Sequence, residues 1–127
     1  MAYIYDEYPL YYDATNEKGL SMAGLNFPGN AHYREAVAGR ENIAPFELIP
    51  WVLCQCRTVR EAEKLLQNTN LTATAFSAEY PISDLHWLIA DREEAITVEA
   101  MADGAVACGL PRQKALEYAA NTLAGAA

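Results

Sequence analysis

The sequence predicts an α+β domain in which two antiparallel hairpins pack against two middle helices, while a helical hairpin closes the C-terminus. Residues 10–25 and 85–99 each contain two short strand-like segments on either side of a turn signal. Between residues 45 and 66, apolar positions recur at helical spacing. The end of the chain is rich in alanine. We therefore divide the chain into residues 1–100 and an alanine-rich helical tail, residues 101–127.

The first predicted hairpin joins residues 10–14 to residues 19–25. Residues 3–12 are rich in tyrosine, which favours extended structure, and the proline at position 9 favours an edge or a loop. Residues 16–19 form a turn signal. Small and apolar residues then alternate from 20 to 26, which indicates a strand packed tightly on one face.

Two helices are predicted in the middle of the chain. Residues 27–42 hold two glycines and a proline and predict a loop. Pro45 suits the first turn of a helix, within which Pro50 predicts a kink or a restart. Thr58 and Glu61 have the spacing of a capping box that starts the second helix. The apolar positions are Phe46, Leu48, Ile49, Val52 and Leu53 in the first helix, and Val59, Ala62, Leu65 and Leu66 in the second.

The second predicted hairpin follows a connecting loop over residues 71–84. A short apolar run at residues 85–90 and an alternating run at residues 96–99 flank the charged turn 91–94. From residue 101 onward no strand pattern is visible. Pro111 suits a helix start, and residues 112–123 place apolar side chains on one helical face.

The charge excludes some classes of partner. Nine basic residues against 17 acidic ones give a net charge of −8, which argues against nucleic acid or an anionic membrane surface. No apolar run approaches the roughly 20 residues of a membrane span. The first residues show no basic segment followed by an apolar core, so we expect no signal peptide and a cytoplasmic location.

A metal site was weighed at Cys54 and Cys56 together with His32 or His86. Zinc sites favour two or more residues between paired cysteines, and a helix would direct these two side chains apart. We therefore predict no metal and no cofactor. His86 lies in an apolar run and is interpreted as a core histidine, and Glu93-Glu94 as a solvated turn.

Four segments carry a resemblance to the choloylglycine hydrolase family, which includes conjugated bile-salt hydrolases and penicillin V acylases. They are DEYPLYYDATNEKGL at residues 6–20, AGLNFP at 23–28, PFELIPWVL at 45–53 and LHWLIAD at 85–91. Their order and spacing also agree with the family. The resemblance covers about residues 3–100, and the subgroup it resembles most is the bile-salt hydrolases.

The resemblance implies part of the N-terminal-nucleophile hydrolase fold, an antiparallel sheet with packed helices. In that family a cysteine at the processed N-terminus attacks the amide that joins a bile acid to glycine or taurine, with its own α-amino group as the base. This sequence begins Met1-Ala2-Tyr3, where the family would already be in a middle strand. We therefore expect a truncated protein that lacks the nucleophile and is inactive alone.

Five residues correspond by position to functional residues of the family. The asparagine of Gly-Leu-Asn helps to bind the oxyanion there, and Asn26 matches it; the alternative is that Asn26 only ends a strand. An aromatic wall for a bile-acid-like apolar ligand is implied at the positions of four residues: Tyr5, Tyr12, Phe76 and Tyr80. The alternative for these four is an ordinary core or surface position.

The tail resembles a different family. Residues 101–127 resemble the C-terminal helical domain of pyrroline-5-carboxylate reductase, where these helices build a dimer interface. The sequence contains no Gly-x-Gly-x-x-Gly pattern for a dinucleotide, so we expect no reductase activity. The chain has the character of two unrelated segments joined.

Two main hypotheses remain open, with a third beside them. The first is a non-catalytic fragment that associates into a homo-oligomer, because missing partner strands leave apolar faces and strand edges bare. The second is a weak amidase, or one half of a split amidase. The third is a module that binds bile acids through its tyrosine-rich wall.

Overall fold

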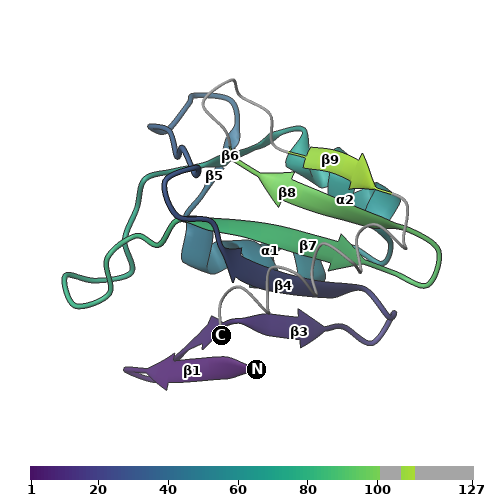
Figure 1. Ribbon diagram of the computed structural model, residues 1–127, viewed down its shortest axis with the longest axis horizontal. Helices are drawn as coiled ribbons and strands as arrows, with labels where there is room; N and C mark the ends of the chain where they lie inside the picture. The colour runs from purple at the N-terminus through teal and green to yellow at the C-terminus, as the bar shows by residue number, and fades with distance from the viewer. Residues whose placement is uncertain (101–106, 111–127) are drawn as a thin grey trace.

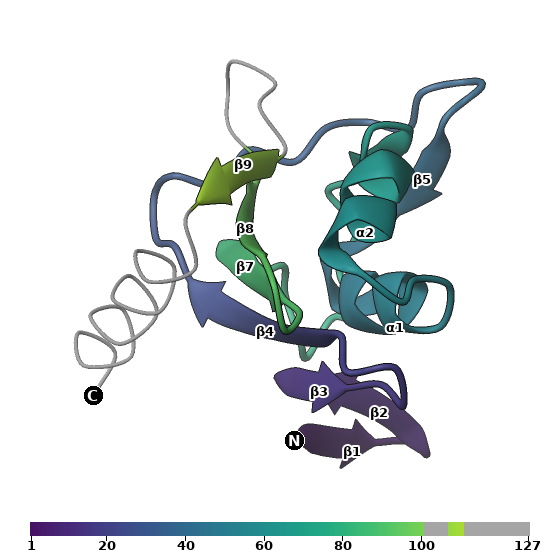
Figure 2. The same ribbon diagram turned by 90° about the vertical axis from the view of Figure 1, so that its right-hand side faces the viewer.

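The computed structural model describes residues 1–100 and 107–110 and confirms the α+β class. Five strands form one antiparallel sheet in the order β3-β4-β7-β8-β9, and the two helices lie together on one face of it (Figures 1 and 2). Two smaller two-stranded sheets, β1-β2 and β5-β6, complete the described strands. None of the described helices is long and apolar enough to cross a membrane.

The strands, in chain order, are β1 (Ala2–Tyr5), β2 (Tyr8–Tyr11), β3 (Asp13–Thr15), β4 (Ser21–Asn26), β5 (Glu41–Ile43), β6 (Thr69–Leu71), β7 (Leu85–Ala90), β8 (Ala95–Glu99) and β9 (Ala107–Leu110). The helices are a short 3-10 helix (Pro45–Glu47), α1 (Leu48–Leu53) and α2 (Val59–Leu66). Both hairpins expected from the turn signals are present, as β3-β4 and β7-β8.

Register places one apolar face of the large sheet against the helices. Met22 of β4 stands opposite Ile89 of β7, and Ile89 in turn stands opposite Ile96 of β8. All three side chains are buried in one core cluster. Because side chains alternate along a strand, Gly24 and Trp87, also opposite each other, share this face.

Capping residues explain where the helices begin. The Glu47 carboxylate accepts a hydrogen bond from the Ala44 N–H at 3.1 Å, and Pro45 occupies the first turn of the 3-10 helix. The change from 3-10 to α-helix comes at Leu48, so Pro50 falls in the first turn of α1 rather than at the kink or restart expected there. Thr58 Oγ1 accepts from the Glu61 N–H at 3.2 Å at the start of α2.

The hairpin prediction was wrong at its N-terminal end. Leu10, assigned to the strand that precedes the first turn, lies instead in β2 and pairs with Tyr3 of β1. The β1-β2 turn uses Asp6 and Glu7, whose φ angles are 51° and 65°. Two consecutive positive φ values match the twist of a tight hairpin turn. Glycine or asparagine usually occupies such positions, so Asp6-Glu7 gave no sequence signal for the β1-β2 turn.

Three further strands were missed. β5 falls at the end of the predicted loop, and β6 begins where the second helix was expected to end. They pair in parallel over three residues each, a length that leaves little periodicity to detect. β9 pairs with β8 inside the tail that showed no strand pattern. The predicted C-terminal helical hairpin lies outside the described residues.

Leu66→Ala tests the helix–sheet core. Leu66 is 1% exposed, and its truncation should lower the free energy of unfolding by about 2–5 kcal/mol because it leaves a cavity. Glu63→Ala, on the exposed face of the same helix, is the control and should stay within about 0.5 kcal/mol. Urea unfolding measures both, and equal losses would contradict this packing.

Candidate functional site

A cleft of about 390 Å³ lies between hairpin β1-β2, the end of β4 and the segment over residues 74–83. Its lining combines residues that are far apart in the sequence and is mainly aromatic and aliphatic. The lining residues are Tyr3, Leu10, Tyr11, Tyr12, Gly24, Leu25, Asn26, Pro45, Phe46, Ile49, Thr74, Ala75, Phe76, Tyr80, Pro81, Ile82, Ser83, Leu85 and Trp87.

The β4-β7 pair supplies five of these lining residues: Leu25, and the four residues Gly24, Asn26, Leu85 and Trp87, which form two cross-strand pairs. Asn26 stands opposite Leu85, and Gly24 stands opposite Trp87. The two residues of each strand are two positions apart, so all four occupy the helix side of the sheet. Asn26 is exposed at the end of β4, where its amide is accessible from the cleft.

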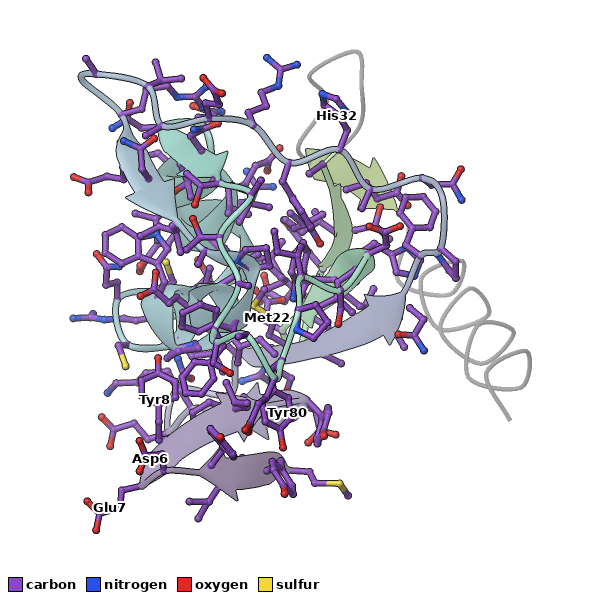
Figure 3. The ribbon with its side chains drawn as sticks, turned by 90° about the vertical axis from the view of Figure 1, so that its left-hand side faces the viewer. Asp6, Glu7, Tyr8, Met22, His32 and Tyr80 are labelled. Carbon is purple, nitrogen blue, oxygen red and sulfur yellow. The ribbon has the colours of Figure 1, made fainter. Side chains whose placement is uncertain are left out.

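One wall of the cleft is an aromatic cluster that ties hairpin β1-β2 to the segment 74–83. The ring of Tyr5 lies 4.7 Å from that of Tyr80 and 5.9 Å from that of Phe76, both in edge-on arrangements. Tyr3 lies 6.1 Å from Tyr80. Figure 3 shows Tyr80 between the hairpin and the body of the protein, and Asp6 and Glu7 at the outer tip of the hairpin.

The same cluster reaches the helix layer. Phe76 lies 5.2 Å from Phe46 and 5.3 Å from Tyr8, and Tyr8 closes the triangle at 6.0 Å from Phe46. Edge-on and offset ring pairs of this kind each contribute about 0.5–1.5 kcal/mol beyond their buried area. The wall is therefore held from the hairpin, the loop and the helix at once.

Two phenols of the wall, Tyr5 and Tyr80, have pKa values raised further above the neutral range. The Tyr5 hydroxyl donates to the Glu79 carboxylate, which raises the pKa of Tyr5. Hydrogen bonding with Tyr3 raises the pKa of Tyr80 to about 12. At neutral pH the wall thus offers neutral phenols, which suit a ligand that is apolar along most of its length.

Tyr33 fixes the end of the segment 74–83. Its hydroxyl donates to the Ser83 carbonyl at 2.8 Å and accepts from the Leu85 N–H at 3.0 Å. Burial raises the pKa of Tyr33 to about 12, and the protonated hydroxyl acts as donor and acceptor at once. The loop therefore enters β7 in a defined direction.

Four of the five predicted site residues line the cleft. Asn26, Tyr12, Phe76 and Tyr80 do so, whereas Tyr5 supports Phe76 and Tyr80 without being part of the lining. Their roles toward a ligand stay predictions.

Several lining residues, among them Tyr3, Ile49 and Trp87, were not predicted from the sequence as part of a site. Period-two alternation along residues 85–90 could have indicated that Trp87 faces the same way as Leu85. The alternation could not indicate that the cleft lies on that side, because the loop and the hairpin that enclose it are distant in sequence.

The cysteines and histidines within residues 1–100 do not line the cleft. Cys54 is exposed just after α1, whereas Cys56 is buried in the core, where burial raises its pKa. His86 is 2% exposed and stacks on Phe27 at 4.4 Å, which confirms its interpretation as a core histidine. Within residues 1–100 and 107–110, no group of three or more potential metal ligands comes together.

Comparison with known families defines the class of protein first and the family second. A family model described as linear amide C-N hydrolases, choloylglycine hydrolase family, matches residues 1–107. The matched class is thus the one described as linear amide C–N hydrolases. The chain belongs to the choloylglycine hydrolase family, as the four sequence segments had indicated.

Relatives share both sequence and structure with the chain. A bile salt hydrolase/transferase of Lactiplantibacillus plantarum is 54% identical over 99 residues, which is 78% of this chain and 31% of the relative. A variant of the conjugated bile acid hydrolase from Clostridium perfringens superimposes with a TM-score of 0.81 at 34% identity, covering 86% of this chain and 34% of that one. The chain therefore spans about a third of the length of these relatives.

Two further matches complete the comparison. Penicillin V acylase from Agrobacterium tumefaciens shares the fold, with a TM-score of 0.61 at 24% identity over 80% of this chain and 29% of that one. A second family model, pyrroline-5-carboxylate reductase dimerisation, matches residues 95–127. The two family matches overlap at residues 95–107, so the first one extends past the boundary expected at residue 100.

Tyr33→Phe tests the buried phenol at the end of the loop. The raised pKa means that the folded protein holds this proton while an unfolded chain releases it near pH 10. The stabilisation is complete below pH 10 and is lost as the pH rises toward about 12. In tyrosinate absorbance titrations, Tyr33→Phe should remove amplitude near pH 12; loss of amplitude near pH 10 instead would contradict the assignment.

Proposed function

We propose that this chain carries the bile-acid-binding wall and the oxyanion asparagine of a choloylglycine-hydrolase-type amidase. We further propose that the 127 residues bind a glycine- or taurine-conjugated bile acid without cleaving it. The observation that carries the proposal is the aromatic cleft with Asn26 at its sheet end. The relatives, a bile salt hydrolase/transferase and a conjugated bile acid hydrolase, indicate the substrate class.

Size and chemistry of the cleft support binding of a steroid amphiphile. A volume of about 390 Å³ falls within the range of small-molecule sites, roughly 300–1,000 Å³. Rigid apolar ring systems gain most from aromatic walls, because each buried contact removes apolar surface from water. The polar lining groups are few, and one of them, Asn26, carries an amide N–H that can donate to a carbonyl oxygen.

The position of the thiols supports the absence of turnover. Amide cleavage by a thiolate needs the sulfur within about 3–3.5 Å of the carbonyl carbon, and a base beside the sulfur. Cys54 is exposed, Cys56 is buried in the core, and neither lines the cleft. Cys108 is in β9, which is separated from β4 by β7 and β8. The two cysteines within residues 1–100 thus offer Asn26 no sulfur partner in the cleft.

Phe76→Ala tests the binding wall. Loss of this ring should weaken glycocholate binding by about tenfold, because about 1.4 kcal/mol of apolar contact is removed. Phe27→Ala removes a ring that stacks on His86 outside the cleft and serves as the matched control, with unchanged affinity expected. Titration followed by tyrosine and tryptophan emission gives both dissociation constants.

The same samples distinguish binding from catalysis. Incubation with glycocholate should release no glycine above a protein-free blank, as measured by chromatography. Release of glycine that Asn26→Ala abolishes would overturn the non-catalytic part of the proposal and favour an amidase. Failure of the chain to bind glycocholate at all would overturn the binding part.

Exposed apolar side chains on hairpin β1-β2 favour a second property, association into a homo-oligomer. Ile4 is 70% exposed and Tyr3 is 47% exposed, and Tyr12 just beyond β2 is 56% exposed. Apolar groups gathered in this way are typical of association surfaces, and a symmetric dimer is the commonest way to cover them.

Ile4→Lys tests this association. In sedimentation velocity at micromolar concentration, the unmodified chain should sediment as an oligomer. Ile4→Lys should shift it toward monomer, because a charge then replaces an apolar contact. Val37→Lys, at another exposed apolar position away from the hairpin, should not cause this shift. A monodisperse monomer for the unmodified chain would contradict the proposal.

A further inference from the structure

The indole of Trp87 lines the cleft next to Gly24, the β4 residue that has no side chain. Trp87 is 2% exposed and stands opposite Gly24 in the β4-β7 register. A Cβ atom built on Gly24 would lie 3.3 Å from Trp87 Nε1 and 3.4 Å from Cδ1. The nitrogen-bearing edge of the ring therefore lies over the glycine, and both residues line the cleft.

The Trp87 N–H has no hydrogen-bond acceptor within the described part of the chain. The other indole behaves differently, because Trp51 Nε1 donates to Thr69 Oγ1 at 3.4 Å. An indole N–H in the core usually finds a protein partner, but Trp87 Nε1 borders the cleft and is not a buried unsatisfied donor, so it stays open to an acceptor from outside the chain. Placed at the surface of a mainly apolar cleft, this donor is suited to an acceptor that arrives with the ligand.

We propose that Trp87 is a ligand-binding residue whose Nε1–H donates a hydrogen bond to an oxygen at the amide-bearing end of the bound molecule. This inference rests on the proposed function, namely that the cleft takes a conjugated bile acid. Asn26 is two residues beyond Gly24 on the same face of β4, a separation of about 7 Å along the strand. If the amide of the bound ligand lies beside Asn26, the oxygen atoms next to that amide come within reach of the Trp87 N–H.

Gly24 has a defined function in this arrangement. Its backbone N–H donates to the Tyr12 carbonyl at 2.8 Å, so the strand is held close to the β2-β3 connection. Any larger residue would place a Cβ atom against Nε1 and narrow the approach to the donor. The glycine thus keeps the indole N–H accessible from the cleft.

Two-dimensional NMR of the ¹⁵N-labelled chain tests the inference directly. The chain has two tryptophans, so two indole cross-peaks are expected, and Trp51→Phe assigns them. On addition of glycocholate, the Trp87 peak should move downfield and its hydrogen exchange should slow, while the Trp51 peak stays in place. Trp87→Phe should weaken glycocholate binding by about 3- to 10-fold, because the N–H donor is lost while an aromatic, though smaller, ring is kept.

Two further experiments identify which ligand oxygen accepts the hydrogen bond and test whether Gly24 keeps the Trp87 N–H accessible. Glycocholate methyl ester removes the terminal negative charge but keeps the amide. If Trp87→Phe weakens binding of the ester as well, the acceptor is the amide oxygen; if it weakens only the acid, the acceptor is the carboxylate. Gly24→Ala should weaken glycocholate binding. It should leave the packing of the core around Ile89 unchanged.

The failures are distinguishable. If glycocholate binds while the Trp87 peak stays in place and Trp87→Phe binds equally well, the inference is overturned and the proposed function stands. If the unmodified chain does not bind glycocholate, both are overturned. If Trp87→Phe does not fold, the peak shift in the unmodified chain decides alone.

Discussion

The antiparallel register between β4 and β7 is the constraint on which the rest of the structure depends. It sets Met22 beside Ile89 in the core and Gly24 beside Trp87 in the cleft. A slip of one residue would turn every one of these side chains to the other face of the sheet. The helices would then lose the apolar surface that they cover, and the cleft would lose its glycine and its indole.

Aromatic contacts extend this constraint to the remainder of the site. The rings of Tyr5, Tyr80 and Phe76 join hairpin β1-β2 to the segment 74–83, and Tyr33 fixes the end of that segment at β7. The cleft is therefore held by contacts between distant parts of the chain. Such an arrangement suits a ligand whose apolar body meets the rings and whose polar end meets the sheet.

Local patterns predicted the elements that have strong local signals. The turn residues between β3 and β4, the cap at Thr58 and the apolar run of β7 all marked structures that are present. Tertiary context decided the rest. The β1-β2 turn adopts positive φ at Asp6 and Glu7, and strands β5 and β6 are too short for a period. Asn26 was found through family resemblance, whereas Trp87 needed the register, which no single sequence segment contains.

Cross-strand nuclear Overhauser contacts test the register most directly. The account predicts contacts that link Gly24 with Trp87 and Met22 with Ile89 across β4 and β7. Contacts that instead link Gly24 with His86 or Leu88 would show a register shifted by one residue. That result would contradict the core, the cleft and the position of the indole together.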